Sequence, residues 1–437
     1  MSPTSGCRKP VSADPAPAAP VTARPVHQVR TRCRACDAER LTRFLELGPQ
    51  PLANANLRSL DDAAGERTFP LDLYFCERCS LVQLADVIDP EVLFRQYIYV
   101  TGTSDTMAEH NRGYARTVTD LLRMGADDLV VEVASNDGSL LACFRDLGVK
   151  TLGVEPAVNI AAIARARGID TVNEFFDGPA GTTLRAERGP AKAVIGNNVL
   201  AHVDDTQDFL RGAGALLAAD GLVITEVPYA RAMLDRLEYD TVYHEHLCYF
   251  SVTALLTLCD AVGLSLIRAD LVPVHGGSVR MYAGRPQHYG GHGADVLRQA
   301  AAERDNGVTS LERWRQFARD VAAQRDALRE LLMRLKAEGR TVAGYGAPAK
   351  GNTLLNYCGI GTDLVPYTVD RSPLKVGTLT PGMHLPVLPA DTLVERQPDF
   401  VLILAWNFAD EIIRQQDAYR QRGGRFIVPI PRPVVVG

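Results

Sequence analysis

The chain has 437 residues, 46% hydrophobic and 23% charged, a composition typical of a globular protein of about two to four domains. Its net charge of −5 argues against an enzyme that grips nucleic-acid backbones, because such enzymes usually carry a basic face. The sequence has no apolar run near the roughly 20 residues of a membrane span and no secretory signal, so we expect a cytoplasmic protein with neither nucleic-acid nor membrane partners.

Residues 1–30 are rich in Pro, Ala and Ser and predict a disordered leader. Residues 31–95 predict a small module with a strand over 67–76 that runs into a cysteine pair. A segment this short builds little core, so a metal cross-link is a sensible way to hold it.

This module contains two CxxC pairs, which predict a closed, structural zinc site. The four expected ligands are Cys33, Cys36, Cys76 and Cys79. The alternative is four ordinary buried cysteines; a redox CxxC would instead be a single pair near a βαβ unit. The other five cysteines are scattered, which argues against a disulfide framework and fits a reducing cytoplasm.

Residues 110–290, within a domain expected over 96–300, alternate strands and helices, a pattern that predicts a parallel sheet covered on both faces. The expected strands lie within 128–135, 150–157, 191–203 and 220–229, and the expected helices within 139–148 and 159–168.

The remainder of the chain predicts a helical stretch at 295–338, counted as a linker helix over 301–338, that bridges two globular bodies. Residues 339–437 then restart the alternation as a second, smaller Rossmann-like unit.

The segment VVEVASNDGSLL (130–141) is a strand, a loop of small residues and a helix start, which suits a bound ligand. It lacks the GxGxxG of dinucleotide enzymes, and an acid in the loop is a poor partner for pyrophosphate. The acid suits the cationic amine of S-adenosylmethionine (SAM), which we favour over NAD and over an unliganded domain. The residues expected to bind SAM are Glu132, Ala134, Ser135, Asn136, Asp137, Gly138, Glu155, Pro156, Asn197 and Asn198. Of these, Glu155 ends the second strand, where a carboxylate can take both ribose hydroxyls.

The run Tyr243, His244, Glu245 and His246 is rich in groups that can exchange protons. Histidine has a pKa suited to general-base work near neutral pH. Because HExxH is absent, we expect no catalytic metal here. The alternative is a set of ordinary core or surface side chains.

Two later glycine-containing segments are candidates for substrate binding. PVHGGSVRMYAG (273–284) brings two glycines close to a cation, although a plain hairpin turn explains it equally well. GYGAPAKGN (344–352) makes a plausible anion cradle, or a Rossmann turn with a solvated lysine. The expected substrate-binding residues are His275, Ser278, Arg280, Lys350 and Asn352.

The order of these features, from about residue 31 to 435, resembles the sugar C-methyltransferases of deoxysugar biosynthesis. The resemblance implies an α/β fold: a class I SAM-methyltransferase Rossmann-like core, a zinc-binding N-terminal module and a smaller Rossmann-like C-terminal domain. It also implies that His246 is the base, with Tyr243 and Glu245 beside it and Tyr97 and His202 lining the site.

The implied substrate is a dTDP-linked 4-keto deoxyhexose, methylated through an enolate in antibiotic sugar biosynthesis. The likeness is greatest to the C-3 methyltransferases of the tetronitrose and kijanose type, which take a dTDP-3-amino-2,3,6-trideoxy-4-keto-hexose. Methylation at C-5 or another position, or O- or N-methylation of a small molecule, are the alternatives. A zinc-containing binding protein with a vestigial SAM fold and a C-terminal nicotinamide reductase are weaker hypotheses. The oligomeric state is open, and a monomer is compatible with the sequence.

Overall fold

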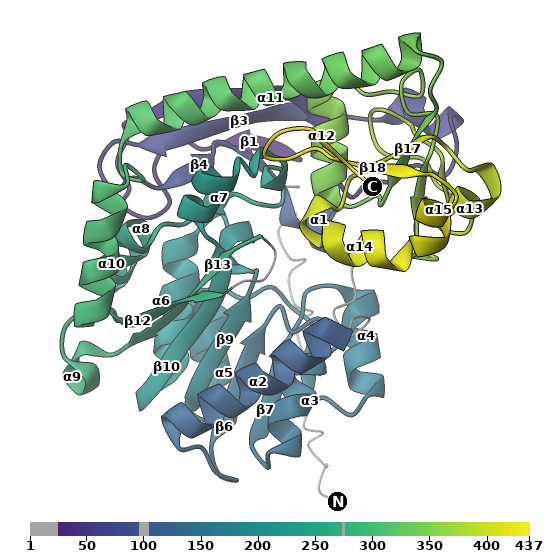
Figure 1. The fold of residues 1–437 in the computed structure, drawn as a ribbon. Helices are drawn as coiled ribbons and strands as arrows, with labels where there is room; N and C mark the ends of the chain where they lie inside the picture. The colour runs from purple at the N-terminus through teal and green to yellow at the C-terminus, as the bar shows by residue number, and fades with distance from the viewer. Residues whose placement is uncertain (1–24, 96–104, 273–275) are drawn as a thin grey trace, which may run out of the picture.

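The computed structural model describes residues 25–95, 105–272 and 276–437. Its strands form a seven-stranded, a six-stranded, a four-stranded and a two-stranded sheet (Figure 1). In the described part of the chain, no helix has both the length and the apolar character needed to cross a membrane.

The N-terminal module is built on the four-stranded sheet, whose strand order is β11-β4-β3-β2. Its antiparallel strands are β2 (Leu41–Pro51), β3 (Thr68–Cys76), β4 (Val82–Leu84) and β11 (Cys248–Tyr249). Strand β11 therefore comes from far along the chain, whereas β3 matches the strand predicted over 67–76. A short strand β1 (His27–Val29), within the predicted leader, pairs with β5 (Asp86–Ile88), and α1 (Pro90–Phe94) follows.

The seven-stranded sheet has the order β12-β13-β10-β9-β6-β7-β8. Its strands are β6 (Leu129–Val133), β7 (Lys150–Val154), β8 (Thr171–Val172), β9 (Ala191–Asn197), β10 (Leu217–Pro228), β12 (Ser265–Val272) and β13 (Ser278–Gly284). All four strands expected here are confirmed. The structure adds β8, and it has β12 and β13 as the strands that flank the hairpin turn considered for 273–284.

The expectation of a purely parallel sheet is wrong at β13, which runs antiparallel to both β10 and β12. The reason is that β12 and β13 are consecutive strands with a short connection. Gly276 and Gly277, which directly precede β13, have φ of 95° and 129°. So short a connection joins only antiparallel strands, whereas parallel strands need a long crossover. The hairpin interpretation of this segment is thus correct.

Helices cover both faces of this sheet (Figure 1). Three of them begin at side-chain caps: Asp177, Asp205 and Ser251 each accept a backbone N–H from the first turn, which satisfies a donor that the helix cannot. The helices are α2 (Asp105–Leu122), α3 (Ser139–Asp146), α4 (Val158–Ala166), α5 (Gly178–Arg188), α6 (Thr206–Leu216), α7 (Ala230–Arg236), α8 (Val252–Val262) and α9 (Pro286–Tyr289).

The stretch predicted as helical over 295–338 forms two helices, α10 (Ala294–Asp305) and α11 (Leu311–Ala337). Helix α11 runs along β3 toward the C-terminal unit (Figure 1). Trp314 and Phe317 on α11 are fully buried, and the Trp314 ring lies 5.4 Å from that of Phe44 in β2. Farther along, Gln324 donates to the carbonyl of Pro429. One helix therefore packs against both ends of the chain.

The C-terminal unit is a six-stranded sheet in the order β16-β15-β14-β17-β18-β19, parallel except for β19. Its strands are β14 (Val342–Tyr345), β15 (Thr368–Asp370), β16 (Val387–Pro389), β17 (Phe400–Ile403), β18 (Arg425–Val428) and β19 (Val434–Val436). Its helices are α12 (Ala349–Cys358), α13 (Thr392–Arg396), α14 (Ala409–Gln415) and α15 (Asp417–Gln421).

A fully buried carboxylate, Glu303 on α10, fastens the start of α8. It accepts hydrogen bonds from the Val252 and Thr253 N–H groups, at 2.7 and 2.8 Å, and from the Tyr229 hydroxyl at 2.9 Å. The Val252 and Tyr229 donors are buried, so leaving them without this carboxylate would be costly.

We expect Glu303→Ala to lower the free energy of unfolding by about 3 kcal/mol, because it leaves several buried donors unpaired. Urea unfolding followed by circular dichroism measures this. The matched control is Glu330→Ala, an exposed glutamate on α11, which should change the free energy by less than about 0.5 kcal/mol. Equal effects in the two variants would contradict the assignment.

Candidate active site and metal centre

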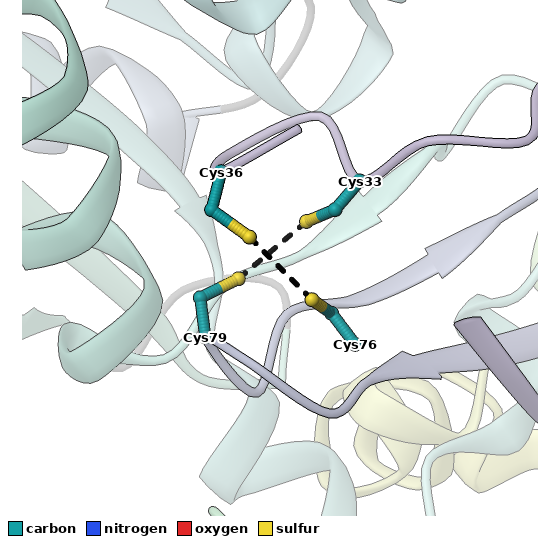
Figure 2. A group of neighbouring side chains, drawn as sticks. All are labelled: Cys33, Cys36, Cys76 and Cys79. Carbon is teal, nitrogen blue, oxygen red and sulfur yellow. Dashed lines mark hydrogen bonds between the residues drawn. The ribbon is translucent and has the colours of Figure 1, made fainter. Parts of the chain in front are cut away.

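The four cysteines of the N-terminal module converge on one point (Figure 2). Their Sγ atoms all lie within 4.8 Å of one another, with Cys33 and Cys79 at 3.5 Å and Cys36 and Cys76 at 3.6 Å. Four thiolates at about 2.3 Å from a tetrahedral zinc ion would stand at similar separations. The donor set therefore fits zinc, and it leaves no ligand position for water.

The two CxxC pairs share one backbone geometry. The N–H of Asp37 donates to the carbonyl of Cys33 at 3.0 Å, and the N–H of Ser80 donates to that of Cys76 at 2.9 Å. Asp37 and Ser80 both have positive φ, at 56° and 64°. Each loop is thus folded tightly enough to aim both thiols inward.

Two of the four thiols, Cys33 and Cys36, favour the charged form, whereas hydrogen bonds with Cys33 raise the pKa of Cys76 to about 12 and raise the pKa of Cys79 above its usual value. Hydrogen bonds from the Cys76 and Cys79 thiols lower the pKa of Cys33 to about 2, and a bond from Cys79 lowers the pKa of Cys36 to about 7. Thiolate is the form that binds zinc, so the cluster suits a cation.

The loop after β6 combines left-handed backbone with a helix start. Ala134, Asn136 and Gly138 have φ of 54°, 50° and 75°, and α3 begins at Ser139. A Cβ on Gly138 would lie 2.8 Å from the Ile169 side chain, so only glycine fits there. The strand–loop–helix predicted over 130–141 is therefore present, and the N–H of Ser139, the first residue of α3, donates to Asp137 Oδ1 at 3.2 Å.

Three carboxylates surround this loop. Asp137 is fully buried and pairs with Arg167 at 2.5 Å. Burial, and then the charges of Asp137 and Glu155, raise the pKa of Glu132 well above its usual range. Glu132 Oε2 is buried with no hydrogen-bond partner among the described residues. Such a site is electrostatically incomplete, and a cationic ligand such as the SAM amine would complete it.

Glu155 at the end of β7 already has backbone partners. Its two oxygens accept the N–H groups of Asn136 and Ala157, each at 2.8 Å. Each carboxylate oxygen keeps a second lone pair, so the role in ribose binding expected of Glu155 is compatible with these bonds. Pro156 accepts from Arg95 at 3.1 Å, which joins α1 to this edge.

Asn197 and Asn198 close β9 at the same edge. Asn198 has φ of 55° and donates its N–H to the carbonyl of Glu226 at 2.8 Å. The side-chain oxygen of Asn197 is buried and has no hydrogen-bond partner in the described chain.

His246 is held in one tautomer. Its Nδ1 lies 2.9 Å from the Thr241 carbonyl, which can only accept, so Nδ1 carries the proton. Its Nε2 is then the acceptor for the Tyr243 hydroxyl, at 2.6 Å. The structure therefore presents Nε2 as the basic nitrogen.

His202 stacks on His246, with ring centroids 5.0 Å apart, and Phe94 stacks on its other side at 5.6 Å. Burial lowers the pKa of His202 to about 4, so it is neutral at pH 7. Its Nε2 is buried, and the described residues offer it no hydrogen-bond partner.

The other two members of the Tyr243–His246 run differ from each other. Glu245 accepts from the side-chain amide of Asn54 at 2.6 Å, whereas His244 is buried and lies 3.2 Å from the Pro70 carbonyl. His244 therefore ties the segment to β3. Asn54 was missed because a lone asparagine in a loop carries no sequence signal.

Arg280 lies at the end of the sheet and pairs with Glu226 at 3.2 Å, above the ring of Tyr114. His110 on α2 approaches the same carboxylate at 3.1 Å. Ser278 pairs with Pro228 across the β10–β13 ladder. Arg280 is therefore neutralised by a buried partner, which weakens the expectation that it is a free cation for substrate.

The C-terminal loop residues meet the N-terminal module. Lys350 lies 3.8 Å from Glu238, and Asn352 donates to the Ala53 carbonyl at 2.7 Å, next to Asn54. A second cation, Lys375, donates to the Ala347 carbonyl at 2.7 Å. Burial lowers the pKa of Lys375, while the charges of Asp370 and Glu245 act in the opposite direction. Sequence reasoning missed Lys375, which follows no motif.

The structure thus gathers Tyr243, His246 and His202 in one cluster, and Asn54 holds Glu245 beside it. The residues expected to bind SAM lie at the carboxyl edge of the seven-stranded sheet. Tyr97 and His275 lie outside the described residues.

Comparison with known proteins assigns a class to each part of the chain. A zinc binding domain matches residues 33–94, a methyltransferase domain matches 107–269, and a C-methyltransferase C-terminal domain matches 273–431. Together with the cysteine cluster and the cofactor loop, these matches define a SAM-dependent C-methyltransferase with a zinc module.

The chain is 38% identical over 404 residues to the C-methyltransferase NovU of Streptomyces niveus, covering 92% of this chain and 96% of that protein. It therefore belongs to the NovU-like C-methyltransferase family.

Two solved structures also match the SAM core. One is the magnesium protoporphyrin IX methyltransferase of Synechocystis PCC 6803, at 16% identity over 41% of this chain and 82% of that one, with a TM-score of 0.31. The other is a SAM-dependent methyltransferase of Clostridium acetobutylicum, at 11% identity over 41% and 92%, with a TM-score of 0.34. These scores are too low to support an inference about this chain.

We expect the purified protein to carry one equivalent of zinc and Cys36→Ser to lose it, because four-coordinate sites tolerate no missing thiolate. Elemental analysis by plasma mass spectrometry measures the content. The control is Cys259→Ser, a buried cysteine in α8, which should keep its zinc. Metal-free wild-type protein that unfolds at the same temperature as zinc-loaded protein would contradict a structural role.

The low pKa of His202 should be visible in the pH dependence of stability. Between its usual pKa of 6.5 and about 4, the unfolded chain binds a proton that the folded chain does not. Stability therefore declines as the pH falls through this window, and we expect a shallower decline in His202→Asn. Urea unfolding over this window measures it, with His288→Asn on the exposed helix α9 as control. Identical curves for His202→Asn and wild type would contradict the pKa assignment.

Proposed function

We propose that this enzyme methylates a carbon next to the keto group of a dTDP-linked 4-keto deoxysugar, with C-3 as the position. The observation that carries the proposal is the His246 pair of hydrogen bonds, which leaves Nε2 as the one basic nitrogen beside a phenol. The family supports carbon methylation; the sugar nucleotide is inferred from the cations near the C-terminal loop.

In this proposal residues 96–300 bind SAM and residues 339–437 bind the nucleotide, with 31–95 as the zinc module and 301–338 as the bridging helix. Glu132, Asp137 and Glu155 would hold SAM, because these three carboxyl groups lie together at the carboxyl edge of the sheet and a bound cation would stabilise the charged form of Glu132, whose pKa burial raises. When bound, SAM supplies the methyl group as an electrophile. Lys350 and Lys375 lie close to the loop after β14, where phosphate oxygens would find both helix N–H groups and cations.

His246 would act first, since the proton must leave carbon before a new carbon–carbon bond can form. The C–H bond breaks, the proton moves to Nε2, and the electron pair passes into the keto group as an enolate. The Thr241 carbonyl, which accepts Nδ1–H, stabilises the resulting imidazolium.

Tyr243 would provide the donor for the enolate oxygen. Its hydroxyl rests on His246 Nε2 and must turn toward the substrate before Nε2 is able to take a proton. His202, neutral and stacked on His246, excludes water and keeps the base from tilting. With C-3 so activated, its electron pair would form the bond to the methyl carbon of SAM, while the S–CH3 bond breaks and S-adenosylhomocysteine leaves with the electron pair of that bond.

A second possibility is methylation of a 4-keto sugar at C-5, through the enolate on the other side of the same ketone. The same base and donor serve either position, so only the pose of the sugar distinguishes them.

We expect His246→Asn to reduce turnover by about 10²–10⁴-fold and to leave SAM affinity nearly unchanged, because general-base catalysis contributes this much. Mass spectrometry of dTDP-3-amino-2,3,6-trideoxy-4-keto-glucose after incubation with SAM detects the gain of one methylene, and calorimetry gives SAM affinity. The control is His288→Asn. Unchanged turnover in His246→Asn would remove this residue from the base role.

The same assay tests the position. Substrate deuterated at C-3 should lose its label in the methylated product. If the wild-type enzyme binds SAM but does not methylate this sugar, the C-3 proposal fails, and 4-keto sugars with a C-3 hydroxyl or a reactive C-5 are the next substrates.

A further inference from the structure

The two stacked histidines are joined directly through their backbones. Leu247, which follows His246, donates its N–H to the carbonyl of Ala201, which precedes His202, at 2.7 Å. This hydrogen bond holds two segments that lie far apart in sequence at the separation that their rings show.

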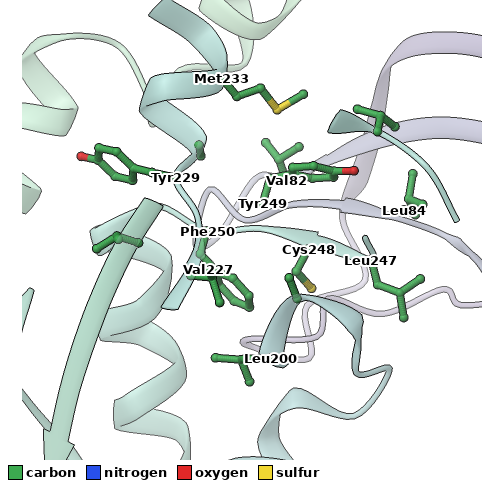
Figure 3. Packing of buried hydrophobic residues seen from close by; sticks show 14 of the residues in the cluster. Val82, Leu84, Leu200, Val227, Tyr229, Met233, Leu247, Cys248, Tyr249 and Phe250 are labelled. Atoms are coloured by element: carbon green, nitrogen blue, oxygen red, sulfur yellow. The ribbon is translucent and has the colours of Figure 1, made fainter. Parts of the chain in front are cut away.

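Both segments also end on the N-terminal module. The carbonyl of Leu247 accepts the N–H of Leu84 in β4 at 3.0 Å, and the carbonyl of Leu84 accepts from Arg34 at 2.5 Å. Figure 3 shows Leu84, Leu247 and Leu200 gathered at this junction, where all three are buried. The junction is therefore dry, and its hydrogen bonds are protected from exchange with water.

Arg34 also contacts the segment that follows His202. Its Nε and one terminal nitrogen lie 3.2 and 3.0 Å from Oδ1 of Asp204, two residues after His202. In the other direction its main-chain carbonyl accepts the Thr206 hydroxyl at 2.9 Å. The ring of contacts thus runs from Arg34 to Leu84, to Leu247, to Ala201, and through the chain to Asp204.

Arg34 also stands between two metal ligands, Cys33 and Cys36, and is only 1% exposed. A buried guanidinium is costly unless it is paired, and a well-packed apolar side chain would stabilise the fold as well or better. What arginine adds is direction, since its planar fork fixes the carbonyl of Leu84 and the carboxylate of Asp204 relative to each other.

We infer that Arg34 is a positioning residue of the active site: by bonding Leu84 and Asp204 from within the cysteine knuckle, it holds the His202 segment in register with His246. The inference rests on the proposed role of His246. The zinc module would then contribute to catalysis through Arg34, in addition to its structural role.

The test compares Arg34→Met with Arg32→Met, a matched arginine in the same knuckle whose side chain is 55% exposed. Three quantities are measured: kcat and KM for SAM, zinc content, and the pH titration of His202. The last is followed by NMR of protein labelled at histidine Cε1, with the His202 signal identified by its loss in His202→Asn.

We expect Arg34→Met to keep zinc and KM for SAM while kcat falls by about 10²-fold, because small displacements of a catalytic group cost this much. Its His202 midpoint should rise from about 4 toward 6.5, because the loosened segment admits water. Arg32→Met should match wild type in all three. If kcat and the His202 midpoint of Arg34→Met both equal those of Arg32→Met, the inference is overturned.

A second variant covers the case in which Arg34→Met fails to fold or loses zinc. Asp204→Asn removes the charge of the partner, whose side chain is 34% exposed, and leaves the knuckle intact. The same two readouts then decide. The His202 midpoint is measured without substrate, so the test of Arg34 is independent of the proposed function. The proposed function fails on a different result, namely unchanged turnover of His246→Asn.

Discussion

The pairing of β11 with β4 is the constraint on which the active site depends. Cys248 and Tyr249 add a two-residue strand to the sheet of the N-terminal module, immediately after the Tyr243–His246 run. Without this pairing the run would be a loop between η4 (Tyr239–Thr241) and α8, free to move with the SAM domain. With it, three parts of the chain meet at one point: the zinc module, the SAM sheet and, through Asn352 and Ala53, the C-terminal unit.

Charge is distributed between two sides of this meeting point. On the SAM side, buried carboxylates without full compensation favour a cation, as the raised pKa of Glu132 reports. On the C-terminal side, Lys350 and Lys375 lie near a helix start. This separation is compatible with the proposed pair of ligands, a cationic methyl donor and an anionic nucleotide-linked acceptor, because the opposite arrangement would repel both.

Sequence patterns predicted most of the fold because they are local. The spacing of Cys33, Cys36, Cys76 and Cys79 and the strand–loop–helix over 130–141 each depend on neighbouring residues, and the structure has both. The strand β11 depends on pairing with the distant strand β4, which no local pattern encodes, whereas the β12–β13 hairpin was open to sequence reasoning through its Gly-Gly turn.

The same distinction applies to the site. His246 stood out because it lies in a run of titratable side chains, whereas Asn54, Lys375 and Arg34 gain their importance from partners far away in sequence. In the sequence, a single asparagine, lysine or arginine in a loop gives no sign of whether its side chain is exposed to solvent or contacts the site. Arg280, expected from the sequence to bind substrate, is paired with Glu226 in the structure, a long-range contact that the sequence pattern does not encode.

The discontinuity of the N-terminal sheet also sets an order of events during synthesis. Strands β2, β3 and β4 and both cysteine pairs are synthesised by residue 84, but the β11 strand that covers the β4 edge ends only at Tyr249. At about 5–20 residues per second, the interval is on the order of ten to thirty seconds. Throughout it the nascent module has an open, apolar strand edge of the kind that invites pairing with other chains. The brevity of β4, three residues long, limits that hazard until β11 has been synthesised.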